Sequence, residues 1–285
     1  MLLTAEAPAK INRELRVGRR RADGFHEIRS RLVSIELADR LEVEPAGSLE
    51  FSSSGFPAPQ DETNLVVRAA RALAEHAGVA PLARIRLEKR VPAGAGLGGG
   101  SADAAVALLL LAKLWGAGVK EEDLSRIAAS LGSDVPFFLV GGQAQAEGRG
   151  ERLRPMDDAP PTELLLLIPP FSISTRAVYD AYARQGRAPD LPERLEIEDS
   201  ARFFGPNDLA SAVLETQSGM EIYMRAAAEA APESAISGSG SAVVLAGATD
   251  AARRELARSR PEAALLSTRT LGRQEYRQRT SSTSR

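Results

Sequence analysis

The alternation of apolar and polar positions predicts two long strands at the start of the chain, over residues 2–18 and 28–44. The Asp23-Gly24 pair between them is typical of a hairpin turn, because glycine tolerates a positive φ. Helical spacing of apolar positions follows over 64–77, and alternation returns over 83–91, which predicts a half-exposed strand. The pattern further predicts an irregular segment over 45–63, helices over 101–115 and 120–132, and a strand, a turn and a strand over 137–148.

The patterns begin again after residue 155, which indicates a second half of the chain. A short apolar run bounded by prolines, at 163–170, is typical of a buried strand. The remaining predicted elements are helices over 174–184, 207–216 and 219–230, a polar loop over 185–206, and an apolar strand beside a Gly/Ser turn within 234–247. We therefore predict an α+β fold with one domain at 1–155, a second at 156–272, and a disordered tail at 273–285, which lacks core-forming residues.

Composition limits the kinds of protein that this chain can be. Its 285 residues are 44% hydrophobic and 26% charged, which is ordinary for a globular protein. The net charge of −2 gives no basic field that would favour nucleic acid, and the absence of cysteine excludes disulfides, thiol catalysis and cysteine-ligated metals. The first residues lack the pattern of a signal peptide, and the longest apolar run, within 104–112, is too short to span a membrane. We expect a soluble, cytoplasmic protein with no obligate protein partner.

A dense glycine cluster precedes an Ala/Leu-rich helix: five of the seven residues from Gly94 to Gly100 are glycine. Residues 94–99 match the dinucleotide pattern G-x-G-x-x-G, but the strand before them carries charges, and the acidic residues about 20 positions on begin a helix. A Walker A loop would need lysine where Gly100 stands, and the glycine loop of protein kinases lies between two strands. Two interpretations remain: an anion site at a helix N-terminus, and a plain turn before a capped helix. The number of glycines favours the anion site.

Two polar side chains lie in the first turn of that helix. Ser101 can cap the helix, bind a phosphate oxygen or help to hold Mg²⁺. Asp103 would be unfavourable beside a phosphate unless it contacts a metal or complements the helix dipole.

Three further segments carry candidate groups, each with a structural alternative. Lys10 and Asn12 lie on one face of the first predicted strand, where an inward-facing lysine would need a partner and a solvated lysine is the alternative. Asp134 lies in a loop after a helix, where a turn aspartate is the alternative. Residues 236–244 form either a simple turn or a second anion-binding turn.

Taken together, these segments resemble the GHMP kinases, a superfamily of small-molecule kinases for galactose, homoserine, mevalonate and related substrates. Three motifs occur in the family's order: PAKIN (8–12), PAGAGLGGGSADAA (92–105) and SGSGSAVV (237–244). The resemblance is strongest to the branch that works in non-mevalonate isoprenoid biosynthesis, through RRADGFHEI (20–28), LGSDVPFFL (131–139), AEGRGERL (146–153) and Asn207-Asp208.

The resemblance implies a fold and a reaction. The expected fold has an N-terminal half like ribosomal protein S5 and an α+β C-terminal half, with ATP and substrate in the cleft between them. The expected reaction is transfer of the γ-phosphate of ATP to the 2-hydroxyl of 4-diphosphocytidyl-2-C-methyl-D-erythritol, with Mg²⁺ as the metal. The expected partner is therefore a small molecule with a cytidine diphosphate moiety.

The resemblance also implies roles for individual residues. Lys10 and Asp134 match the family's catalytic pair. The expected ATP-binding residues are Asn64, which matches a position near the adenine, and Pro92, Ala93, Gly94, Ala95, Gly96, Leu97, Gly98, Gly99, Gly100, Ser101 and Ala102, with Ser101 also the expected metal ligand. The expected substrate-binding residues are Asn12, Asp23, Gly24, Phe25, His26, Tyr179, Gly238 and Ser239, of which Phe25 replaces the commoner tyrosine.

Two alternatives stay open at this point. Another GHMP kinase, of the homoserine or mevalonate type, would share the glycine loops but not segments 20–28 and 131–139. A nucleotide-binding regulatory protein would keep the loop without catalysis, which the presence of Lys10 and Asp134 disfavours. Arg13 and Glu14 stand where the family usually has apolar residues, so the first strand must pack differently there.

Overall fold

The computed structural model describes residues 1–187, 189–191 and 202–284, so the predicted loop at 185–206 lies partly outside the described residues. Its strands are β1 (Leu3–Arg20), β2 (His26–Glu44), β3 (Leu49–Gly55), β4 (Ala83–Lys89), β5 (Gln143–Gly148), β6 (Arg152–Pro155), β7 (Glu163–Ile168), β8 (Glu233–Ile236), β9 (Val243–Ala246), β10 (Ala264–Arg269) and β11 (Thr283–Ser284). Its helices are α1 (Leu65–Ala77), α2 (Gly99–Leu114), α3 (Glu121–Leu131), α4 (Phe137–Val140), α5 (Thr175–Arg184), α6 (Ala210–Thr216), α7 (Met220–Ala230), α8 (Asp250–Ser259) and α9 (Arg273–Thr280). Across the described ranges, none of the helices has the length and apolar character needed to cross a bilayer.

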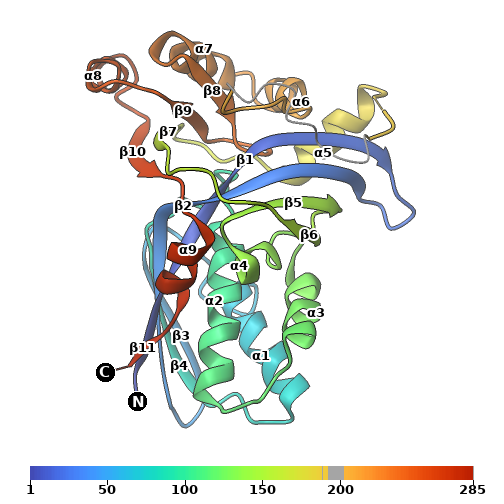
Figure 1. The fold of residues 1–285 in the computed structure, drawn as a ribbon, viewed down its shortest axis with the longest axis vertical. Helices are drawn as coiled ribbons and strands as arrows, with labels where there is room; N and C mark the ends of the chain where they lie inside the picture. The colour runs from blue at the N-terminus through green and yellow to red at the C-terminus, as the bar shows by residue number, and fades with distance from the viewer. Residues whose placement is uncertain (188, 192–201, 285) are drawn as a thin grey trace.

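The long hairpin of β1 and β2 connects the two halves of the molecule (Figure 1). Most of it belongs to a sheet with the strand order β11-β1-β2-β4-β3, to which β5 adds beside β2, and β6 beside β5. Helices α1, α2 and α3 lie on one face of this sheet, where Leu41, Ile85 and Leu108 belong to one buried core. The tip of the hairpin reaches the other half, where Leu15 and Val17 join a second core.

The second sheet has the strand order β10-β7-β9-β8. Its strand β7 is apolar along nearly its whole length because both of its faces are covered, as expected for a fully buried strand. One face packs against α5, α6 and α7, and the other contributes Leu166 to a third core with Ile11 and Ile35 of the hairpin. The two halves therefore meet in a continuous apolar layer.

Three of the predictions differ from the structure. Residues 137–140 form helix α4 and not a strand, since a short apolar run does not distinguish the two and Pro136 suits a helix start. Strand β3 lies within the segment predicted to be irregular, where it pairs in parallel with β4 at the sheet edge. The predicted disordered tail is wrong over 273–284, which forms α9 and β11.

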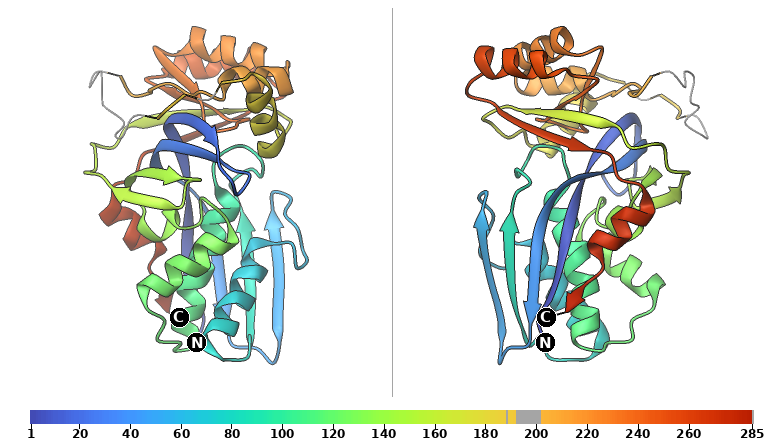
Figure 2. Two further views of the ribbon diagram at one scale, coloured as in Figure 1. Left: turned by 90° about the vertical axis from the view of Figure 1, so that its right-hand side faces the viewer. Right: turned by 60° about the vertical axis from the view of Figure 1, so that its left-hand side comes forward.

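The C-terminal residues return to the first half of the molecule after the second sheet is complete. Helix α9 packs beside β1, and β11 pairs with the start of β1 (Figure 2). One buried aromatic side chain, Tyr276, and ion pairs from Arg279 to Glu6 and Glu36 hold α9 there. Such a helix has few apolar residues, which explains why composition suggested disorder.

Replacing Gly141 by alanine should destabilise the protein more than the same change at Gly78. Both glycines have a positive φ, 65° and 64°, but their ψ angles differ: Gly78 lies in the left-handed α region at 31°, where alanine costs about 1–2 kcal/mol. Gly141 has a ψ of −174°, in a region that is essentially restricted to glycine, so its backbone cost is larger. A Cβ at Gly141 would collide with the ring of Tyr276, whereas a Cβ at Gly78 meets nothing within 4 Å. We expect Gly141→Ala to lose about 1–3 kcal/mol more free energy of unfolding, measured by urea denaturation. Equal losses would contradict this packing.

Candidate active site

The first strand is shaped so that Lys10 and Asn12 face inward together. The pairing of β1 with β2 shifts register between Pro8 and Lys10 and again between Asn12 and Glu14. Such bulges bend a strand locally and redirect its side chains, and they often occur beside active sites. The backbone N–H of Lys10 donates to the carbonyl of Leu97 at 2.9 Å, which attaches this part of β1 to the glycine loop.

The structure brings Lys10 and Asp134, the expected catalytic pair, close to each other. The Lys10 ammonium is buried and lies 3.4 Å from a carboxylate oxygen of Asp134, whose side chain is 38% exposed. The same ammonium donates to Asn12 Oδ1 at 2.6 Å, and Asn12 Nδ2 donates to Ser30 Oγ at 2.7 Å. The lysine is therefore held by a hydrogen-bonded chain, while the carboxylate remains accessible from solvent.

The glycine loop ends at the N-terminus of α2, directly beside Lys10. Gly98 is the N-cap, with a φ of 71°, and a Cβ there would lie 2.8 Å from Phe138 Cζ and 3.0 Å from Lys10 Cγ. Within the part of the chain that the structure describes, no side chain caps α2, so Ser101 does not act as its cap. The first N–H groups of a 16-residue helix therefore remain available to an anion.

Asp103 points away from this N-terminus, into a buried ion-pair cluster. Lys89 Nζ donates to Asp103 at 2.7 Å and to Asp39, and the second oxygen of Asp39 accepts from the N–H groups of Arg90 and Val91. Burial raises the pKa of the Asp103 carboxyl well above its ordinary value, although the Lys89 ammonium opposes this shift. The cluster thus fastens the glycine loop at both of its ends.

A second glycine loop, from the other half of the molecule, meets the first. Ser237 Oγ donates to the carbonyl of Gly96 at 2.9 Å, and the backbone N–H of Ala242 donates to the carbonyl of Ala95 at 3.0 Å. A Cβ at Gly238 would lie 2.9 Å from Asn12 Oδ1 and 3.7 Å from Lys10 Nζ, so this loop borders the site.

Neighbouring polar groups hold the second loop in place. Ser239 shares a 2.9 Å hydrogen bond with Thr175. Asn207 Nδ2 donates to the carbonyl of Gly238 at 2.8 Å, and Asp208 accepts from the N–H of Val17 on β1. The Asn207-Asp208 pair therefore ties the loop to the hairpin.

An aromatic wall lies at the tip of the hairpin. His26 and Tyr179 have ring centroids 5.8 Å apart and tilted by 31°. Burial, and then the negative charge of Asp134, raises the pKa of the Tyr179 phenol. Phe25 is 48% exposed beneath the guanidinium of Arg149, whose carbon lies 5.1 Å from the ring centre. Asp23 and Gly24 form the exposed turn that carries Phe25.

The structure relates Asn64 and Ser101 less directly to the pair of Lys10 and Asp134. The Asn64 amide caps α1 by accepting from Val66 N–H, and it also donates to the carbonyl of Pro59. Its neighbour Leu65 approaches Gly100, so the start of α1 adjoins the start of α2. Residues 1–187, 189–191 and 202–284 contain no group of three His, Cys, Asp or Glu side chains that could hold a metal. A metal here would depend on phosphate oxygens, with a hydroxyl such as that of Ser101 as an additional ligand.

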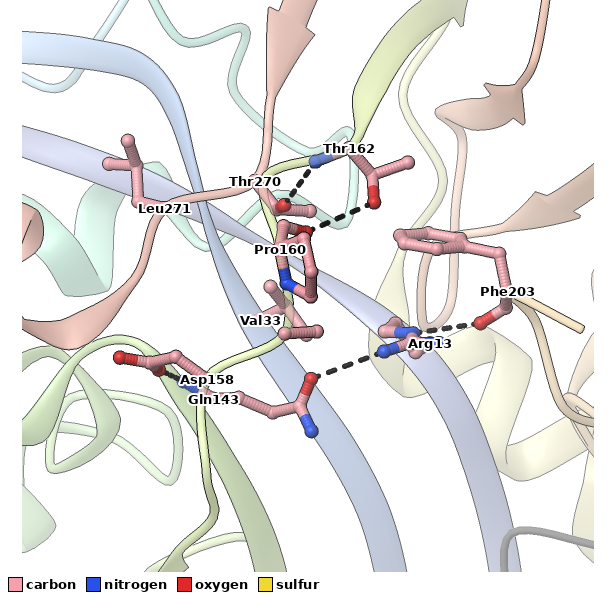
Figure 3. Close-up of a pocket in the computed structure, with 10 residues that line it drawn as sticks. Arg13, Val33, Gln143, Asp158, Pro160, Thr162, Phe203, Thr270 and Leu271 are labelled. Atoms are coloured by element: carbon pink, nitrogen blue, oxygen red, sulfur yellow. Dashed lines mark hydrogen bonds between the residues drawn. The ribbon is translucent and has the colours of Figure 1, made fainter. Parts of the chain in front are cut away.

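The unusual residues Arg13 and Glu14 are accommodated by the second bulge. Arg13 is the unpaired residue of that bulge, and its guanidinium lies 4.3 Å from the ring centre of Phe203 while donating to the Phe203 carbonyl and to Gln143 (Figure 3). Burial, and then the charge of Arg31, lowers the pKa of Arg13. Glu14 is buried and ion-pairs with Arg31. The small pocket lined by Arg13 and Phe203 contains none of the predicted site residues.

Lys89 and Asp39 are structurally important residues that the sequence analysis did not single out. A signal was present for Lys89, which alternates in phase with the buried Ile85 and Leu87. Asp39 lies in β2 with no comparable pattern, and only the three-dimensional pairing shows its role.

Comparisons with known proteins agree with this geometry. Residues 64–142 match the family model "GHMP kinases N terminal domain". A 4-diphosphocytidyl-2-C-methyl-D-erythritol kinase of Pelotomaculum thermopropionicum is 46% identical over 213 residues, which cover 74% of this chain and 72% of the relative.

Solved structures show the same relationship. A crystal structure of 4-(cytidine 5'-diphospho)-2C-methyl-D-erythritol kinase matches 94% of this chain and 99% of its own, with a TM-score of 0.79 and 39% identity. Homoserine kinase from Cytophaga hutchinsonii matches 96% of this chain and 95% of its own, with a TM-score of 0.66, but at 16% identity it shares the fold alone.

Asp103→Asn should weaken the pH dependence of stability. A carboxyl whose pKa is raised on folding contributes stability at low pH, which is lost as pH rises above 3.8 and through the raised value. Each unit of that shift corresponds to about 1.4 kcal/mol. We expect urea midpoints of the parent protein to fall more steeply from pH 5 to pH 8 than those of Asp103→Asn. The exposed Asp157→Asn serves as the control, and parallel profiles for all three would refute the assignment.

Proposed function

Because the chain belongs to the GHMP kinases, and among them to the 4-diphosphocytidyl-2-C-methyl-D-erythritol kinases, we propose that it phosphorylates the 2-hydroxyl of that cytidylyl alcohol with ATP. The protein is an ATP-dependent small-molecule kinase of isoprenoid biosynthesis. The homoserine and mevalonate alternatives are supported by the fold alone, since those neighbours share 10–17% identity.

One observation in the structure supports phosphoryl-transfer chemistry. An accessible carboxylate, Asp134, and a buried ammonium, Lys10, lie 3.4 Å apart beside the open N-terminus of α2. Phosphoryl transfer depends mainly on positioning and on charge neutralisation, and these three features supply both. A hydroxyl bound next to Asp134 would face phosphates bound at Gly98.

The roles follow from burial and charge. Asp134 accepts the proton of the attacking hydroxyl or orients that hydroxyl, and its partial exposure lets the substrate reach it. Lys10 stabilises the negative charge that develops on the attacking oxygen and on the transferred phosphoryl group. Asn12 keeps the lysine ammonium in place through its 2.6 Å hydrogen bond.

The residues at the helix start suit ATP and its metal. The free N–H groups of α2, together with the loop at 92–102, would hold the phosphates. When bound, Mg²⁺ supplies neutralisation of phosphate charge, and Ser101 would hold it together with phosphate oxygens. Asp103 is unsuited to hold the ion because its carboxylate is buried and one of its oxygens is paired with Lys89.

The opposite end of the substrate would lie along the hairpin tip. Phe25 and Tyr179 offer aromatic faces suited to a pyrimidine ring, and the buried His26 packs beside Tyr179. Gly238 borders Asn12, Ser239 follows it in the same loop, and both would contact the methylerythritol portion.

An assay of ADP release with Mg-ATP tests the substrate assignment. We expect turnover with 4-diphosphocytidyl-2-C-methyl-D-erythritol and none with homoserine or mevalonate. Turnover of either other alcohol would overturn the substrate while keeping the kinase assignment. Folded protein that binds ATP but turns over none of the three would instead support a regulatory role.

Asp134→Asn and Lys10→Met should each lower kcat by about 10²–10⁴-fold, because each removes a group that acts on the reacting atoms. Lys113→Met, at an exposed lysine that hydrogen-bonds Ser282, is the matched control and should retain parent activity. Circular dichroism and steady-state kinetics at saturating ATP would check all three. If both site variants keep the parent kcat, the catalytic pair is wrongly assigned.

A further inference from the structure

We propose that Tyr276, on the C-terminal helix α9, is a positioning residue for the carboxylate of Asp134. The proposal rests on the proposed function, because it assumes that Asp134 acts on the attacking hydroxyl. It gives a role in catalysis to a segment far from the glycine loops and catalytic motifs in the sequence.

Tyr276 holds α4 through both its hydroxyl and its ring. The hydroxyl donates a 2.7 Å hydrogen bond to the carbonyl of Phe138, and the whole side chain is buried in the first core. The ring lies against Gly141, the residue that ends α4, so closely that no larger residue fits there. Tyr276 therefore covers the C-terminal end of this short helix.

Helix α4 in turn determines where Asp134 lies. The helix begins three residues after Asp134, and the carbonyl of Asp134 accepts from the N–H of Phe137 in its first turn. A helix of four residues has too few internal hydrogen bonds to be stable by itself, so its position depends on what it packs against. Any shift of α4 would be transmitted to Asp134 over this short connection.

The opposite side of α4 contacts the phosphate-binding loop. The Phe138 ring packs against Gly98 so closely that a Cβ there would be 2.8 Å from Phe138 Cζ, with Lys10 Cγ at 3.0 Å on another side. Helix α4 is thus held between Tyr276 and the glycine loop. Loss of the Tyr276 contact would let Asp134 move relative to Lys10.

Helix α9 is itself fixed at both ends. Near its start, Arg273 donates to the carbonyls of Gln143 and Met156 at 2.6 and 3.1 Å. Near its end, Arg279 ion-pairs with Glu6 on β1 and Glu36 on β2, the strands that carry and flank Lys10. The contact to α4 therefore comes from an element attached to the same hairpin as the catalytic lysine (Figure 2).

The test is Tyr276→Phe, which keeps the ring and removes only the hydroxyl. Because displacement of a reacting group by about 1 Å can cost 10²-fold, we expect a smaller shift to lower kcat by about 10-fold, with the KM for ATP nearly unchanged. Tyr223→Phe is the matched control: Tyr223 is also buried, and its hydroxyl also has one acceptor, Glu262 at 2.8 Å. It should lose stability without losing kcat.

A double-mutant cycle separates positioning from general weakening. In an Asp134→Asn background, Tyr276→Phe should cause no further loss of kcat, because the group that it positions is already absent. An equal fold-loss in both backgrounds, or a kcat within twofold of the parent for Tyr276→Phe alone, would overturn the proposal. An inactive parent enzyme would point to failure of the proposed function and not of this inference.

A second variant covers the case in which Tyr276→Phe does not fold. Arg279→Met loosens α9 from outside the core, and Arg258→Met, at a surface pair with Glu255 on α8, is its control. We expect a smaller loss of kcat from Arg279→Met that again disappears with Asp134→Asn. Parent kcat in Arg279→Met, at a temperature where it is folded, would count against the proposal.

Discussion

The buried ammonium group of Lys10 is the constraint around which this structure is arranged. A charge removed from water is stable only with a partner and with hydrogen bonds to its donors, and here Asp134 and Asn12 supply them. Strand alternation puts the lysine and the asparagine on the same side of β1, between two bulges, and α4 brings the carboxylate to them. The same geometry that makes the lysine tolerable inside the protein also makes it useful to a developing negative charge.

The molecule contains a second buried lysine, and the contrast between the two supports the catalytic role that we propose for Lys10. Lys89 is shared by Asp39 and Asp103, both almost completely buried, and this arrangement leaves no carboxylate for a substrate. Within the described part of the chain, Lys10 has one carboxylate partner, Asp134, which lies at the longer distance of 3.4 Å and is 38% exposed. A fully buried ion-pair cluster suits the holding of a loop, whereas an ion pair whose carboxylate is in contact with solvent suits catalysis.

Local patterns in the sequence were sufficient to predict the hairpin and helices α1 and α2. They also identified the segments that carry Lys10, Gly98 and Asp134. The partnership of Lys10 with Asp134 came from family resemblance, since 124 positions separate them and no periodicity links them. The prediction for the C-terminus failed because α9 is held by one aromatic ring and several ion pairs, and composition measures neither. Register shifts, which place Arg13 outside the ladder, also depend on the partner strand and not on the residues of β1 alone.

Close contacts within the protein explain why glycine is needed at two positions of the glycine cluster. A side chain at position 96 would collide with the second loop. A side chain at position 98 would collide with Phe138 and Lys10. These contacts are between parts of the protein and would exist without any ligand. Their consequence is that the loop approaches β1 and the second half of the chain closely while the N–H groups at the start of α2 stay unoccupied. Close packing by glycine on the inner side of the loop thus leaves its outer side open for the phosphates that we propose it holds.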